Sequence, residues 1–255
     1  MPDTLYNWTD TSLAELPQTR GFRQRGMEMT RLETFTDAAF AFAVTLLVIS
    51  VDDVPRSYEE FINALKQIPV FIACFIQLMV FWWGHHRWSR RYGLEDGWSM
   101  LGSLTLVAAV LIYIYPLRVI FGAFFADASD GFIPIPFELE LVEVGTLFVV
   151  FGAGFSSLAG LVVVLYVIAL IRRETLALDR REVFQTQAAV IGWSLVTLTG
   201  LVSLILAATL PAELSPNSAY AYWSLIITMP AYSWYARHQS ARLQNRNFSR
   251  DVQPS

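Results

Sequence analysis

The stretch RLETFTDAAFAFAVTLLVISV, residues 31–51, begins with charged side chains and continues as an almost wholly apolar segment. Its length suits a helix that crosses a membrane, yet Asp37 lies inside the apolar part. A carboxylate at that depth must face protein, water or a basic partner. Helical spacings of three and four place one stripe of side chains along the segment: Phe42, Thr45, Leu46 and Ile49. The stretch therefore predicts a membrane helix with a polar base and a mostly apolar stripe.

The whole chain has the composition of a membrane protein with several spans. Apolar residues make up 55% of the 255 residues and charged residues 16%, whereas soluble domains carry about 25% charged residues. The mean hydropathy is +0.44. One cysteine, Cys74, excludes an intrachain disulfide and Cys-based metal sites, and three histidines are too few for a multi-histidine metal or haem enzyme. We therefore predict an all-α polytopic membrane protein that has no cofactor and is not an enzyme.

Six apolar segments are long enough to cross a hydrocarbon core about 30 Å thick. The second contains Pro69, and the fourth is the longest and is expected to tilt. The predicted spans are Phe35–Val51, Phe61–Gly84, Trp98–Ala126, Leu141–Ile171, Ala188–Leu210 and Ala219–Ala236. Glycines 145, 152, 154 and 160 in the fourth span predict close helix–helix contacts rather than a hinge.

Basic residues are concentrated on one side of this predicted topology. Fifteen of the 18 lie in the two terminal segments and in the second-to-third and fourth-to-fifth connections, and basic loops face the cytosol. The chain then divides into a cytosolic N-terminal tail (1–30), a membrane domain (31–236) and a cytosolic C-terminal tail (237–255). The opposite connections are acidic. Asp52 and Asp53 follow the first span, where they form either an acidic outer mouth that concentrates cations or an ordinary solvated loop.

Two histidines, His85 and His86, lie at the cytosolic end of the second span, level with Arg31 and Asp37. A hydrogen-bonded cluster of Asp37 with Arg31 or one histidine would hold the first span in place. The alternatives are that Asp37 merely anchors its own helix beside Arg31, or that the histidines confer a pH response. Adjacent helical residues point about 100° apart, and further Cys or His ligands are missing, so we predict no metal site.

The first span also carries a family signature. Arg31, Phe35, Thr36 and Asp37, followed by AFAVTLL (residues 41–47), resemble the RxxxFSD first-helix signature of the bacterial transmembrane protein 175 family, prokaryotic relatives of the endolysosomal potassium channel. FWWGHHR (residues 81–87) resembles the family's Trp-x-x-His run, here Trp83 and His86 with His85 beside them. Tyr115-Pro116 and the six-span layout agree with the resemblance, while Thr36 replaces the signature serine.

The resemblance implies a homotetrameric, potassium-preferring cation channel of a prokaryotic plasma membrane, with potassium as the permeant ion and lipid as its surroundings. Four copies of the first helix would line a central pore. By position, Phe42 matches the narrow apolar constriction, which is usually isoleucine. Leu46 and Ile49 match apolar rings above it, and Thr45 matches a threonine linked to selectivity. A ring of four phenylalanines would alter gating and conductance.

Three other functions are compatible with parts of the sequence. A proton-coupled secondary transporter would use Asp37 as its proton carrier, but the inverted repeats typical of transporters are not evident. An intramembrane enzyme would need a base near Ser156 and Ser157, and no histidine occurs at matching depth. A non-conducting scaffold is separated from a channel only by measurement of current.

Overall fold

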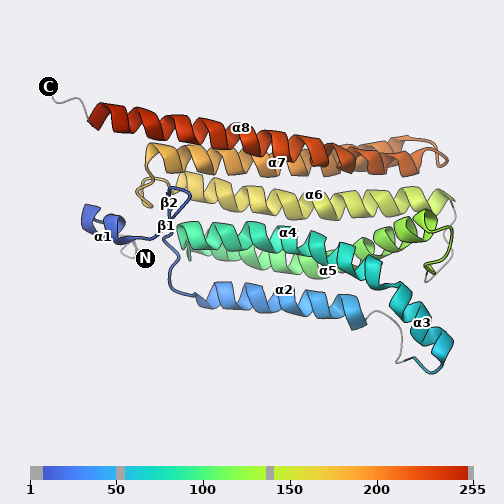
Figure 1. Cartoon of the computed structure of the whole chain (residues 1–255). Coiled ribbons are helices and arrows are strands. Elements are labelled where there is room, and N and C mark those ends of the chain that lie inside the picture. The colour runs from blue at the N-terminus through green and yellow to red at the C-terminus, as the bar shows by residue number, and fades with distance from the viewer. Residues whose placement is uncertain (1–7, 50–54, 136–140, 252–255) are drawn as a thin grey trace.

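The computed structural model describes residues 8–49, 55–135 and 141–251 and is built almost entirely of helices. Long helices run side by side and alternate in direction along the chain (Figure 1). They are α2 (Arg31–Ile49), α4 (Ile68–Tyr92), α5 (Gly97–Ala128), α6 (Leu141–Ile171), α7 (Arg180–Thr209) and α8 (Tyr220–Asp251). Each predicted apolar segment thus coincides with one of these helices over most of its length, so the chain is mostly helical, as predicted.

Within the described residues, four helical stretches are long and apolar enough to cross a membrane. They are Tyr58–Tyr92, Gly97–Ala128, Glu143–Ile171 and Arg180–Thr209. The chain is therefore an integral membrane protein. That α2 and α8 also cross, which would give six spans, stays a prediction.

The second predicted span is divided in two. A short helix, α3 (Tyr58–Lys66), ends at Gln67 and α4 begins at Ile68, so Pro69 lies in the first turn of α4 rather than inside a continuous helix. Proline is well tolerated there because its missing N–H has no partner in the first turn. Figure 1 shows α3 inclined away from the side of the bundle at the end where α4 begins.

The other helix ends are fixed by local hydrogen bonds. Asp96 caps α5 by accepting from the Ser99 N–H at 2.9 Å, and Asp179 caps α7 by accepting from the Glu182 N–H at 2.8 Å. Gly93 ends α4 with a φ of 57°, the left-handed conformation that glycine adopts without a Cβ penalty. These caps place the ends of α4, α5 and α7 close together at one end of the bundle.

The core lies between α4, α5, α6 and α7 and depends on close approach of the helices. A Cβ on Gly152 would lie 3.0 Å from the Cβ of Leu204 on α7, and one on Gly154 would meet the ring of Tyr113 on α5. The two glycines therefore occupy contact positions, as predicted from the sequence. Gly160 is looser, because its nearest neighbour would be Thr197 at 3.8 Å.

The described part of the segment predicted as an N-terminal tail, residues 8–30, folds against the bundle. It contains α1 (Asp10–Glu15) and a hairpin of β1 (Gln18–Thr19) and β2 (Phe22–Arg23). Phe22 is buried edge-on against Tyr92 of α4, with ring centroids 5.5 Å apart. Buried Arg25 donates to the carboxylate of buried Glu182, with Nη2 2.8 Å from Oε2. Breaking such a buried pair typically costs about 3–5 kcal/mol, because one charge is left alone in the core. A short 3₁₀ helix, η1 (Ser215–Ala219), joins α7 to α8.

Candidate functional site

Helix α2 forms the edge of the bundle and packs by one side only (Figure 1). Thr30 accepts a hydrogen bond from the Glu33 N–H at 3.1 Å, the arrangement of an N-cap, so the helix begins at Arg31. Phe40, Ala43 and Leu47 are buried against the neighbouring helices. The opposite side of the helix carries the exposed residues Arg31, Thr34, Phe35, Ala38, Ala41, Phe42, Thr45 and Val48. A helical stripe of α2 is therefore uncovered along its whole length.

Two of the four predicted pore residues lie on this uncovered stripe. Phe42 is 55% exposed, and Thr45 is exposed one turn further along. Leu46 lies at the border and packs partly against the core. Ile49 ends the helix, and its side chain lies outside the described residues, as do Asp52 and Asp53 of the predicted outer mouth.

The Thr45 hydroxyl is held by its own helix. It is placed to donate to the carbonyls of Phe42, at 2.7 Å, and Ala41, at 3.0 Å. Because the hydroxyl hydrogen is used in this way, the oxygen lone pairs remain for a ligand on the exposed side. The side chain therefore offers an acceptor, suited to a cation, midway along the stripe.

The base of α2 is joined to α4 by a polar and aromatic cluster, which we call the α2–α4 cluster: Glu33, Asp37, Trp82 and His86. The Trp82 indole N–H donates to Asp37 Oδ1 at 2.8 Å, and His86 Nδ1 lies 3.6 Å from Glu33 Oε1. The rings of Trp82 and His86 stack, with centroids 5.0 Å apart and planes inclined by 17°. The two acids are four residues apart on α2, and the two rings are four residues apart on α4. One turn of α2 therefore pairs with one turn of the antiparallel α4.

The cluster differs in membership from the one predicted. Asp37 receives its hydrogen bond from Trp82, whereas the predicted donors were a histidine or Arg31, which is exposed. Trp83, predicted to support the signature, is 58% exposed, and His85 points to α5, with Nε2 2.9 Å from Ser103 Oγ. Thr36 is fully buried, and its hydroxyl has no hydrogen-bond partner among the described residues.

Sequence reasoning missed Glu33 and Trp82. Glu33 lies one turn before Asp37 on the same helical side, and Trp82 lies one turn before His86. That matched spacing was the available signal, but single-helix periodicity does not tell which of two adjacent tryptophans turns inward.

The cluster is also the one place among the described residues that groups three possible metal ligands. Ligand atoms of Glu33, Asp37 and His86 lie within 4.8 Å of one another, and Glu33 is buried. Glu33 Oε2 has no hydrogen-bond partner among the described residues. A water, a proton shared with His86 or a cation would satisfy it equally well, so the absence of a metal site stays a prediction.

Together, the long apolar helices and the uncovered stripe of α2 define a polytopic helical membrane protein. Comparison with known proteins identifies the family. The family described as "Endosomal/lysosomal potassium channel TMEM175" matches residues 31–116, which include α2, the α2–α4 cluster and most of α5. A protein of Marivirga tractuosa named "Potassium channel" is 31% identical over 193 residues, covering 72% of this chain and 77% of that protein. The chain belongs to the TMEM175 family.

A solved structure supports the fold across nearly the whole chain. The crystal structure of the potassium channel MtTMEM175 T38A variant, in complex with a Nanobody-MBP fusion protein, matches with a TM-score of 0.74 and 26% sequence identity. The match covers 89% of this chain and 100% of that one. The resemblance recognised from residues 31–37 is thereby confirmed.

Proposed function

We propose that this chain forms a potassium-preferring cation channel, with α2 as its pore-lining helix. The observation that carries the proposal is the uncovered stripe of α2 with Phe42 and Thr45 on it, in a chain of the TMEM175 family. The membership of a channel family also argues against enzymatic chemistry. Ions would pass down their gradient in a prokaryotic plasma membrane, surrounded by lipid.

The pore would be assembled from four copies of the chain around a common axis. A single copy leaves the Phe42 side of α2 uncovered by its own bundle. Symmetry-related copies would bring these sides together, which explains why the small residues Ala38 and Ala41 lie on the same stripe. Small side chains permit close helix approach within a membrane.

Phe42 would form the constriction in this arrangement. Four phenyl rings make an apolar ring that excludes water when closed and passes partly dehydrated ions when open. Thr45 lies one turn away and would present four hydroxyl oxygens to a dehydrating cation. Leu46 and Ile49 would continue the apolar wall, and Asp52 and Asp53 would concentrate cations at the outer mouth.

The α2–α4 cluster would hold the base of the pore helix in register. Trp82 donates to Asp37, and His86 lies 3.6 Å from Glu33, both on the side of α2 that packs on α4. The two acids would therefore face the protein and not the pore. Arg31 and Phe35, on the exposed stripe, would lie at the cytosolic entrance. The terminal segments, 1–30 and 237–255, would then lie in the cytosol, in keeping with their arginines.

Ion flux from the purified protein in liposomes tests the function. We expect potassium flux that exceeds sodium flux and does not saturate like a carrier. Saturable counterflow would instead identify a transporter, and no flux of either ion would identify a scaffold.

Substitution of Phe42 by alanine tests the assignment of the constriction. The smaller side chain should raise single-channel conductance or closed-state leak several-fold, because the apolar ring widens. Ile205→Ala is a matched control, since Ile205 is also an exposed apolar residue but lies on α7, across the bundle from α2 (Figure 1). Equal currents in the Phe42 variant and the wild type would remove Phe42 from the pore.

A further inference from the structure

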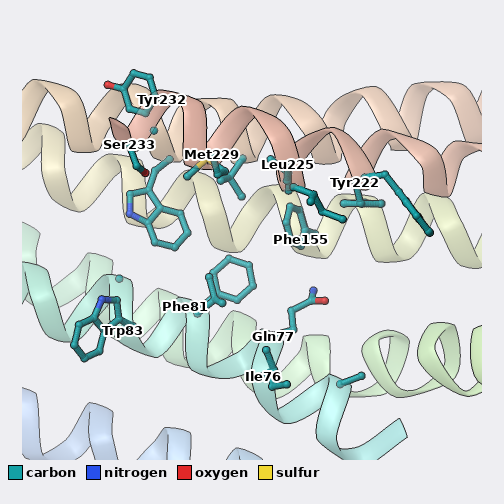
Figure 2. A pocket seen from close by; sticks show the side chains of 18 of the residues that line it. Ile76, Gln77, Phe81, Trp83, Phe155, Tyr222, Leu225, Met229, Tyr232 and Ser233 are labelled. Carbon is teal, nitrogen blue, oxygen red and sulfur yellow. The ribbon is translucent and has the colours of Figure 1, made fainter. Parts of the chain in front are cut away.

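A large groove separates α8 from α4. Its volume is about 1870 Å³, which exceeds the roughly 300–1,000 Å³ of typical small-molecule pockets. Helix α8 packs on α7 and η1, and Phe155 of α6 lies behind the gap between α4 and α8 (Figure 2). Phe81 and Gln77 of α4 face Leu225 and Met229 of α8 across it. The groove thus has two helical walls and an apolar floor.

The groove is apolar along most of its length and strongly basic at one end. Apolar side chains on both walls are uncovered: Val80 of α4 is 51% exposed and Ile226 of α8 is 68% exposed. Five arginines line one end: Arg20, Arg87, Arg91, Arg181 and Arg237. The acid of the lining, Asp127, belongs to the last turn of α5, at the opposite end of the bundle. The groove therefore has the polarity of an amphiphile with a negative head.

These arginines are not neutralised by acids within the described residues. Arg181 donates to the Ser240 hydroxyl at 3.3 Å and to the Arg20 carbonyl at 3.2 Å. Arg237 donates to the Ser233 carbonyl at 3.0 Å, and Arg91 contacts Gln185 at 3.4 Å. All four of these acceptors are uncharged.

Arg87 completes the group of unneutralised charges. The charged side chains that act on it are two further arginines, Arg91 and Arg20, and no acid among the described residues is one of them. By contrast, Arg23 and Arg25 of the neighbouring hairpin are paired with Asp179 and Glu182. Like charges gathered without a counter-charge favour the binding of an anion.

We propose that this groove binds an anionic phospholipid, with the phosphate between the arginines and the acyl chains along the apolar walls. Basic pockets between membrane helices are suited to anionic lipid headgroups because the charge and the hydrocarbon are satisfied together. A soluble anion would leave Val80, Ile226 and the rest of the apolar wall uncovered. In the topology proposed above, the lipid comes from the cytosolic leaflet.

Native mass spectrometry of the purified full-length protein tests the preference directly. Phosphatidylglycerol should bind more tightly than phosphatidylcholine with the same acyl chains. The double variant Arg87→Gln/Arg237→Gln should weaken phosphatidylglycerol binding roughly 30-fold, since each arginine near an anionic headgroup contributes about a fivefold factor. Phosphatidylcholine binding should change little. Unchanged elution and helical circular dichroism would show that the variant is folded.

Arg173→Gln is the matched control, because Arg173 lies near the same end of the bundle but outside the groove, exposed and paired with Glu174 at 3.9 Å. It should keep wild-type lipid preference. Equal binding of the two lipids by the wild type, or an equal loss in the control variant, would overturn the proposal.

Crosslinking locates the lipid. A phosphatidylglycerol with a photoreactive acyl chain should label α4 and α8 at groove positions such as Val80 and Ile226. Labelling confined to other helices would overturn the proposal, as would an Ile226→Cys disulfide between copies, which would mean that a second copy fills the groove. Neither measurement depends on ion flux, so failure here leaves the channel proposal untouched.

Discussion

Two adjacent tryptophans on α4 have opposite environments. Trp82 turns inward and donates to Asp37 of α2, whereas Trp83 turns outward and is 58% exposed. Asp37 lies within the apolar part of α2, and the indole N–H of Trp82 supplies a donor for that carboxylate at 2.8 Å. The partner of this acid therefore comes from α4 and is not a basic residue.

Replacing Trp82 by phenylalanine should destabilise the protein by roughly 1.5–3 kcal/mol, the usual range for a hydrogen bond to a charged group. The phenyl ring keeps much of the stacking on His86 but donates no hydrogen bond. Thermal unfolding of the purified protein measures the effect, and Trp83→Phe provides the control because its ring is largely exposed. Equal melting temperatures for the two variants would contradict the assigned role of Trp82.

The limits of sequence reasoning are also visible at this scale. The spacing of Phe42 and Thr45 correctly predicted residues on a common side of α2, because helical periodicity is a local property. The spacing did not predict that Leu46 packs partly against the core. Nor did it distinguish Trp82 from Trp83, since the choice depends on where α2 docks, and that is set by many tertiary contacts.

Among the helices, the closest packing is between α6 and its neighbours α5 and α7. Glycines along α6 were predicted to be contact positions, and the structure divides them by tightness. Gly154 abuts the Tyr113 ring, whereas Gly160 has an ordinary distance of 3.8 Å to Thr197.

Alanine substitutions should therefore have opposite effects at these two glycines. Gly154→Ala forces a methyl group against a buried ring, and overpacking of this kind costs roughly 1–3 kcal/mol. Gly160→Ala should be neutral or stabilise by up to about 1 kcal/mol, because alanine favours the helix. Melting temperatures of the two variants, each compared with the wild type, give the result. A less stable Gly160 variant would argue against the packing of α6 on α7 described above.

The predicted helix boundaries agree with the structure where the length of an apolar segment sets them. The fourth predicted span, Leu141–Ile171, coincides with α6. The second predicted span does not coincide with a single helix. A proline inside an apolar segment is compatible with a kinked helix or with the start of a new helix, and Pro69 lies at the start of α4. The fifth begins earlier than predicted, since the polar turn from Arg180 is capped by Asp179 and packs against the hairpin.

At the scale of the whole molecule, the described part of the segment before α2 is folded, although its composition predicted a tail. Residues 1–30 are polar and rich in arginine, which predicted a tail. Their folding depends on partners far along the chain, above all Glu182, which receives hydrogen bonds from Arg23 and Arg25. Long-range ion pairs of this kind leave no periodic signal in the sequence.

The segment between the hairpin and α2 restricts how α2 is able to move. The backbone N–H groups of Arg25 and Gly26 donate to the Arg91 and Arg90 carbonyls at 3.3 and 3.1 Å, and Arg90 donates to the Met27 carbonyl at 3.2 Å. Three residues then remain before Arg31, too few to allow α2 a large translation along its own axis.

We therefore expect gating to be a tilt of α2, in which its N-terminal end stays fixed and its C-terminal end moves. In the proposed assembly, spin labels at Val48 of different copies should change their separation between conditions that open and close the channel, while labels at Arg31 stay nearly still. Equal changes in distance at both positions would mean that the N-terminal end of α2 does not stay fixed.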